Sequence, residues 1–365
     1  MPDADKGASV RDFEAPAFYA DASLPFGVAR VLPPAAFHGL AFHQMEDLAI
    51  WSRHWICVGT HDEIPDNGDL LPYTVGTHGL HVQRTATGLA ARFNKAQHGG
   101  CRAVPVQCQT GSKTKCSFTS CGYSRDRDAL RAGGPGEGSP EMHQYLGLRP
   151  ERLLTAAVRS WGPMIFLSLD ASPGDLPAGA FAPVLPRPFF DNARGQRLAS
   201  RWLEVKANWK LLAPALLGGL EQPTEEENCL AGRVRFGDTE GQAAWFFPNL
   251  VLLDDGEQTC AIVLQPTAVG RTLCRIGIYG DGEDAEAATN RWTSRLATAC
   301  RQAEIEQEDA FGWGTAARPE TLDIDPPLQG CFPGAWMQQI LARKVLSVSA
   351  MTFDLHRYQS SGRRP

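Results

Sequence analysis

The sequence contains no uninterrupted apolar run of the ~18 to 20 residues that a transmembrane helix requires. Its first residues, MPDADKGASVRDFEAP, lack the basic and then apolar order of a secretory signal peptide. Lys and Arg (35) are fewer than Asp and Glu (41), so the net charge is −6, and no basic stripe is present. We therefore expect a cytoplasmic protein that binds neither membranes nor nucleic acid.

Cysteine is not scarce, because the chain contains ten. Cytoplasmic cysteines stay reduced, so metal binding or simple burial explains them better than a disulfide framework. Four of them fall between Cys101 and Cys121, and this density marks a candidate site. With 365 residues, of which 43% are hydrophobic, the chain is long enough for one large or two ordinary domains.

The residue patterns divide the chain into three parts. Residues 1–40 are rich in Pro, Ala and Asp and are predicted to form an N-terminal arm. Short alternating runs, broken by DNG, GTHG and ATG, predict a small antiparallel β domain over residues 41–160. Residues 161–365 combine several strands with a long helical pattern from about Ala285 to Phe311, which predicts a sheet wrapped on a helix. The fold class is therefore α+β.

Seven stretches, in this order and at these separations, resemble the α subunits of Rieske non-haem iron oxygenases. They are IWSRHWICVGTHDEIPDNGDL, FNKAQHGG, CSFTSCGY, SWGPMIFLSLD, ANWKLL, FFPNLVLL and EIEQEDAF, and they cover nearly the whole chain. The resemblance implies a Rieske-like β domain with a [2Fe–2S] cluster and a helix-grip catalytic domain with one Fe(II). It also implies assembly into rings of three subunits.

The cluster motifs of the family are only partly kept. Its first half reads Asn-x-Cys-x-His-x-Gly, and NKAQHGG here puts Ala96 at the cysteine position and keeps His98. Its second half begins Cys-Pro-Tyr-His, and CSFT here keeps Cys116 but has Thr119 at the second histidine position. A methyl group cannot donate to iron, so we expect no [2Fe–2S] cluster.

A second register puts Cys121 at the family's cysteine position and Ser124 at the histidine position, and it loses the same number of ligands. The cysteine-rich segment also offers another metal site. His98, Cys101, Cys116 and Cys121 supply nitrogen and sulfur ligands at spacings that a structural zinc ion tolerates. The alternative is that these small side chains fill the space of the lost cluster without any metal.

The iron ligands expected from the resemblance have changed as well. The stretch ANWKLL keeps the family's Asn-Trp-Lys start, but counting onward places Glu221 and Glu226 at the two histidine positions of the facial triad. The third ligand is retained as Asp309, with Glu308 and Glu306 as register alternatives. We therefore expect no Fe(II) of the family kind.

Two interpretations of these acidic residues remain open. Glu221, Glu226 and Asp309 together would form an all-carboxylate site that suits Mg²⁺, Mn²⁺ or Ca²⁺. The stretch LEQPTEEEN also has the composition of a solvated acidic loop after a helix. Without a cation, three carboxylates in one dry pocket would repel each other and turn outward or take up protons.

A Rieske oxygenase passes electrons from its cluster through a bridging carboxylate to an imidazole-ligated iron, and this sequence is altered at each step. At the bridging position stands Gly218. We therefore expect a catalytically silent α-subunit-like protein without resident iron cofactors. It would pair with an active oxygenase paralogue in a mixed, trimer-based ring and stabilise or regulate it.

Three alternatives compete with this hypothesis. The chain could be a repurposed enzyme that uses the old pocket for redox-neutral acid/base chemistry on a small organic substrate. It could be a free-standing binding protein for such a molecule. It would be an active Rieske-type subunit if unusual ligands held the metals.

Overall fold

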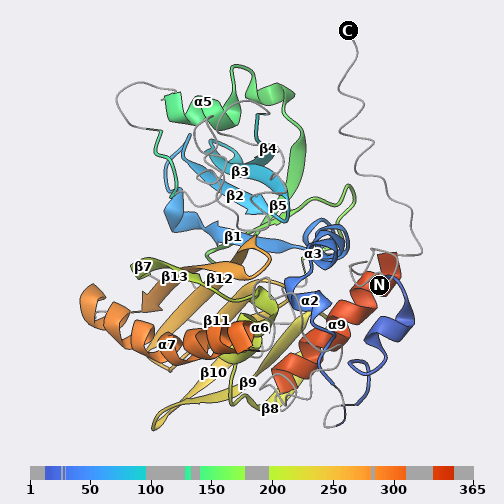
Figure 1. The fold of residues 1–365 in the computed structure, drawn as a ribbon. Helices are drawn as coiled ribbons and strands as arrows, with labels where there is room; N and C mark the ends of the chain where they lie inside the picture. Colours follow the sequence, from blue (N-terminus) through green and yellow to red (C-terminus); the bar gives the residue numbers. More distant parts are fainter. Residues whose placement is uncertain are drawn as a thin grey trace.

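The structure is a computed structural model that describes residues 13–25, 28, 30–95, 128–132, 140–176, 197–280, 284–309 and 332–348. At residues 140, 141, 144 and 309 only the backbone is described. The chain forms two antiparallel sheets, which lie one above the other in Figure 1, with the long helices on the lower sheet. The expected α+β class, with a small β unit and a helix-grip unit, is confirmed.

The smaller sheet has six strands in the order β1-β6-β5-β4-β3-β2. The strands are β1 (Ile56–Thr60), β2 (Leu70–Val75), β3 (His78–Thr85), β4 (Gly88–Phe93), β5 (Thr155–Trp161) and β6 (Met164–Ser168). Beside them lie the short helices η3 (His61–Glu63), α5 (Pro140–Leu146) and η4 (Pro150–Arg152). Strands β2 and β3 pair directly through a turn at Gly76, where a positive φ of 56° favours glycine. The bounds 41–160 for this unit stay a prediction.

The N-terminal helices pack against the larger unit. They are η1 (Pro16–Tyr19), α2 (Ala35–His38), α3 (Leu40–Glu46) and the π-helical turn η2 (Asp47–Trp51). Within α3 and η2, the apolar residues Phe42, Met45 and Ala49 are all buried. This spacing of three and four residues keeps their side chains on one face of the helix.

The larger sheet has seven strands in the order β7-β13-β12-β11-β10-β9-β8. They are β7 (Arg197–Val205), β8 (Glu221–Glu226), β9 (Cys229–Phe236), β10 (Thr239–Phe246), β11 (Leu250–Asp254), β12 (Gln258–Ala268) and β13 (Arg271–Gly280). Its central strand β11 is buried along its whole length. The edge strand β8 is exposed along its whole length.

Three helices cover one face of the larger sheet, namely α6 (Trp209–Leu216), α7 (Ala285–Asp309) and α9 (Phe332–Val348) (Figure 1). The long helix expected from about Ala285 is confirmed. Its buried apolar side chains include Ala288, Trp292, Leu296 and Ala303, which repeat at helical spacing and lie on the side that faces the sheet. The opposite side of α7 is polar and exposed.

A side-chain amide joins the two sheets. Asn249, which precedes β11, accepts a hydrogen bond from the Cys57 backbone N–H at 2.9 Å and donates one to the Cys57 carbonyl at 2.7 Å. Nearby, the Arg275 guanidinium of β13 lies 4.8 Å from the centre of the Tyr73 ring of β2. The two sheets therefore share one continuous hydrophobic core.

The cysteines within the described residues, Cys57, Cys229, Cys260, Cys274 and Cys300, are free and buried. Burial raises the pKa of the Cys57 thiol above its ordinary range, so the group stays protonated in the core. None of the described helices combines the length and the apolar character needed to cross a membrane.

Candidate functional site

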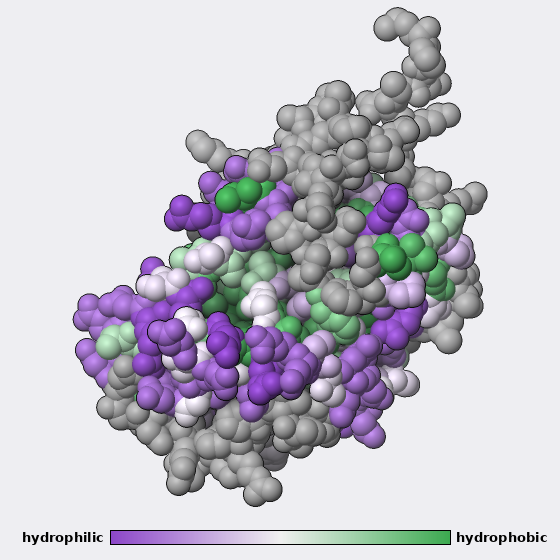
Figure 2. All heavy atoms as spheres, turned by 90° about the horizontal axis from the view of Figure 1, so that it is seen from below, coloured by the Kyte–Doolittle hydropathy of each residue, from purple (hydrophilic) through white to green (hydrophobic). Residues whose placement is uncertain are grey.

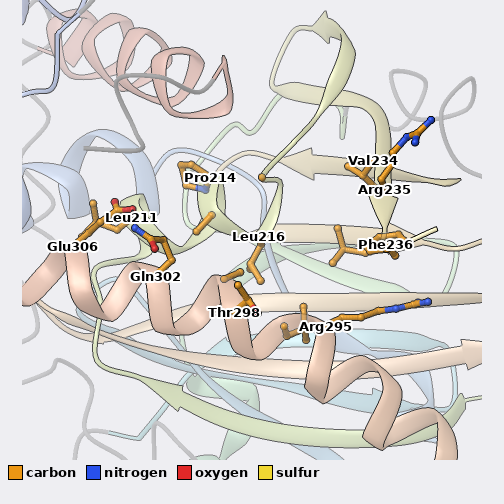
Figure 3. A pocket seen from close by; sticks show the side chains of 16 residues that line it. Leu211, Pro214, Leu216, Val234, Arg235, Phe236, Arg295, Thr298, Gln302 and Glu306 are labelled. Atoms are coloured by element: carbon orange, nitrogen blue, oxygen red, sulfur yellow. Dashed lines mark hydrogen bonds between the residues drawn. The ribbon is translucent and has the colours of Figure 1, made fainter. Parts of the chain in front are cut away.

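A cavity of about 660 Å³ lies between α6, α7 and the strands β9 and β11. Figure 3 shows Pro214 and Leu216 on one wall and residues of α7 on the other. The lining is mainly apolar, and its volume is in the range of small-molecule sites. Figure 2 shows the lower face of the molecule, where apolar side chains gather in a recess that polar side chains surround.

The start of α6 is fixed to the end of α7 by one asparagine. The Asn208 side chain caps α6 by accepting a hydrogen bond from the Lys210 N–H at 3.0 Å. Its backbone N–H donates to Gln307 Oε1 of α7 at 2.9 Å, and its side-chain amide donates to the Val269 carbonyl at 2.7 Å. These bonds set the separation of the two helices at one end of the cavity.

One face of α7 supplies the polar groups of the cavity. Arg295, Ala299, Gln302 and Glu306 follow one another at intervals of four, three and four residues, so they project on the same side of the helix. In Figure 3, Gln302 and Glu306 lie together near Leu211, whereas Arg295 lies at the other end. The cavity therefore has an acidic end and a basic end.

The acidic end consists of Glu306, whose exposed fraction is 6%. Gln302 Nε2 donates a hydrogen bond to Glu306 Oε1 at 3.2 Å. Burial raises the pKa of the Glu306 carboxyl, and this hydrogen bond only partly opposes the shift. A carboxyl group with a raised pKa can exchange a proton with a ligand or accept hydrogen bonds from it.

At the basic end, Arg295 is already engaged. Its guanidinium forms an ion pair with Asp255 and lies 4.9 Å from the ring centres of both Phe236 and Trp292. Burial acts to raise the pKa of Asp255, but the hydrogen bond from Arg295 helps to hold it below its ordinary value. The basic end is therefore neutralised within the protein, whereas no ion pair neutralises Glu306 among the described residues.

The structure places the two glutamates predicted at the histidine positions outside this cavity. Glu221 and Glu226 are the first and last residues of β8, and both are exposed. This segment is an edge strand and not the expected acidic loop, because residues 221–226 pair with β9. Its expected exposure to solvent is confirmed. Gly218 does line the cavity, at the turn that follows α6.

The acidic residues near the end of α7 are separated by the turn of the helix. Glu306 lines the cavity, while Glu308 is exposed. Asp309 is the last residue of α7, and its side chain lies outside the described residues. Within the described part of the chain, no three His, Cys, Asp or Glu side chains come close enough together to hold a metal ion.

The predicted cluster and zinc positions lie in a part of the chain that the structure does not describe. These positions are Ala96, His98, Cys101, Cys116, Thr119 and Cys121. Both hypotheses about this segment stay predictions. From the sequence, Glu306 was expected only as a register alternative to Asp309, and Gln302 was not predicted. The spacing of both residues from Arg295 along α7 is nevertheless that of one helical face.

No protein-family model matches the sequence. The biphenyl 2,3-dioxygenase α subunit of Rhodococcus jostii is 28% identical over 149 residues, which are 40% of this chain and 31% of that protein. The N,N-dimethyl phenylurea N-demethylase α subunit of a Sphingobium species is 26% identical over 148 residues, 39% of this chain and 31% of that protein. The similarity thus spans less than a third of the length of either relative.

The fold is similar to solved structures over most of the chain. A quaternary ammonium Rieske monooxygenase in complex with γ-butyrobetaine superposes with a TM-score of 0.59 at 16% identity, covering 90% of this chain and 98% of that one. Naphthalene 1,2-dioxygenase from a Rhodococcus species gives a TM-score of 0.52 at 14% identity, covering 87% and 95%. The sequence is thus similar to Rieske oxygenase α subunits over about two fifths of its length, and the fold is similar to solved Rieske oxygenases over most of it.

Proposed function

We propose that this chain is a catalytically silent member of the Rieske oxygenase α-subunit group that assembles with an active paralogue and stabilises or regulates it. The observation that carries the proposal is the position of Glu221 and Glu226 at the exposed edge of the larger sheet. Side chains at these positions do not fit a facial triad, because its ligands must converge on one ion. The cavity itself offers one carboxyl group, from Glu306, within its described lining.

The sequence supports the same proposal at the cluster positions, where Ala96 and Thr119 replace a thiolate and an imidazole. Assembly has a precedent in the fold, since a solved quaternary ammonium Rieske monooxygenase transfers electrons between its subunits. A subunit interface depends on apolar contact area and shape, so it can persist after the metal ligands are lost. We propose a mixed, trimer-based ring, located in the cytoplasm.

Two measurements on the purified full-length chain test this proposal. The first is the visible absorption spectrum together with the iron content. We expect a colourless protein with far less than one iron atom per chain. A brown preparation with stoichiometric iron, or oxygen consumption when only a reductase is added, would disprove the silent role. Zinc analysis of the same sample decides the proposal of a structural zinc at His98, Cys101, Cys116 and Cys121.

For the second measurement, the untagged protein is purified from the cells that produce it naturally. The proteins that co-purify with it are then identified. We expect an intact Rieske oxygenase α subunit in a complex of defined size. A stable homo-oligomer that never contains such a subunit would contradict the pairing.

A second function is favoured by one specific observation, the Glu306 carboxyl in a mainly apolar cavity. A buried acid of this kind is suited to redox-neutral acid/base chemistry on a small organic substrate. Turnover by the isolated chain that Glu306→Gln abolishes, without iron and without a reductase, would support this enzyme instead of the silent subunit.

A further inference from the structure

The cavity between α6 and α7 has the properties of a ligand site that needs no metal. Its volume of about 660 Å³ is sufficient for a small organic molecule. Leu211 and Pro214 of α6 and Val234 of β9 give it apolar walls. Thr298 on α7 is exposed, which marks the side on which the cavity opens to solvent.

No cationic side chain among the described residues pairs with Glu306. Among the described residues, its carboxylate accepts a hydrogen bond from the neutral Gln302 amide at Oε1, and the exposed fraction of the residue is 6%. The lining contains two guanidinium groups, and each has a carboxylate partner: Arg235 pairs with Glu240 and Arg295 pairs with Asp255. On α7, Arg295 lies eleven residues before Glu306. Eleven residues of α-helix span about 16 Å, so this charge cannot serve Glu306 as a direct partner.

A metal ion is a poor occupant for this end of the cavity. Hard cations such as Mg²⁺ and Ca²⁺ require six or more oxygen ligands, of which several are usually carboxylates. Glu306 is the carboxylate of the described lining, and its neighbour Gln302 presents an N–H rather than an oxygen toward it. An organic ammonium group needs fewer partners, because it combines one positive charge with two or three N–H donors.

We propose that the α6–α7 cavity binds an amphipathic organic amine, with the ammonium group on the Glu306 carboxylate and the apolar body against Leu211, Pro214 and Val234. The ammonium group supplies the missing counter-charge, and the apolar walls remove the remainder of the ligand from water. The raised pKa of Glu306 agrees with this geometry, because an acid without a cationic partner in an apolar site favours its neutral form. This inference concerns the cavity alone and holds whether or not the chain pairs with a paralogue.

The test is isothermal titration calorimetry of the full-length chain, in the presence of a chelator, with benzylamine and with the neutral benzyl alcohol. We expect benzylamine to bind more tightly than benzyl alcohol. In Glu306→Gln the affinity for benzylamine should fall at least about tenfold, because a charge-assisted hydrogen bond is lost. Benzyl alcohol should bind this variant and the wild type equally. Glu286→Gln, an exposed acid at the start of the same helix, should leave both affinities unchanged.

Ala299→Leu provides an independent variant, because a larger side chain on the cavity wall should weaken both ligands without changing any charge. Equal binding of benzylamine to the wild type and to Glu306→Gln, or preference for the alcohol, would overturn the proposal. So would amine binding that disappears with the chelator, since the amine would then be held by a metal. The comparison of Glu306→Gln with the wild type is made with the chelator present and needs no partner subunit, so its failure is distinguishable from a failure of the proposed function.

Discussion

Lys210 Nζ donates a hydrogen bond to Glu46 Oε1 at 2.7 Å, and both side chains are almost completely buried. The ammonium group also lies 5.4 to 5.6 Å from the ring centres of Phe37, Phe42 and Trp209. Burial raises the pKa of the Glu46 carboxyl and lowers the pKa of the Lys210 ammonium, while the charge of each group opposes the shift of the other. The pair joins α3 to α6, 164 residues apart in sequence.

Removing one member of this pair should destabilise the protein strongly, because the other charge would remain buried without a partner. We expect Lys210→Met or Glu46→Gln to lower the free energy of unfolding by about 3 to 5 kcal/mol. The double variant Glu46→Leu/Lys210→Met should recover much of this loss. Urea unfolding measures all three.

The exposed pair Arg235–Glu240, with an N···O distance of 3.2 Å, provides the matched control. Arg235→Met should cost at most about 1 kcal/mol, because water screens both charges. A similar loss in the Lys210 and Arg235 variants would show that burial does not determine the strength of the first pair.

Asn249 should be essential for the contact between the two sheets. Asn249→Ala removes the partners of the Cys57 N–H and carbonyl, which are buried, and each unsatisfied group costs about 1 to 3 kcal/mol. We expect a clear fall in thermal stability. The variant Gln242→Ala, at an exposed position of β10, should change it little. Unchanged stability of Asn249→Ala would mean that water replaces both hydrogen bonds.

The stability contribution of Glu306 should depend on pH. Its pKa in the folded protein is raised above the ordinary value of 4.5, so the folded state binds this proton more tightly than the unfolded state does. Relative to Glu306→Gln, the wild type should be most stable below this ordinary value and should lose stability as the pH rises through the raised pKa. Urea unfolding between about pH 4 and pH 8 measures the difference. A difference between the wild type and Glu306→Gln that stays constant over this pH range would contradict the raised pKa.

The acidic edge strand should tolerate substitution. Glu221→Ala and Glu226→Ala remove exposed side chains of β8, so each should change the free energy of unfolding by less than about 0.5 kcal/mol. Metal content should be unchanged as well. A loss of bound metal in either variant would mean that these residues are ligands and would undermine the proposed silent role.

Several elements followed from the sequence because they depend on local patterns. The helical pattern from about Ala285 to Phe311 predicted the long helix α7, and its residues Ala288, Trp292 and Leu296 are buried at intervals of four on one face. Alternating residues and turn signals predicted the small antiparallel β unit in the same way. The α+β class and the likeness to Rieske oxygenase α subunits were therefore accessible without coordinates.

What only the tertiary structure decided was which acidic residues share a site. In the sequence, Glu221 and Glu226 were the candidates at the histidine positions, and Glu306 was only a register alternative to Asp309. Side-chain type and spacing do not tell which face of a sheet or helix meets a cavity. Residues 221–226 pair with β9 as an edge strand, where Glu221 and Glu226 are exposed to solvent. The packing of α7 beside α6 places Glu306 in the lining of the cavity. The contact between α6 and α7 joins residues far apart in sequence, such as Asn208 and Gln307, which are 99 residues apart. It depends on the free energy of burying the whole core, which no local pattern contains.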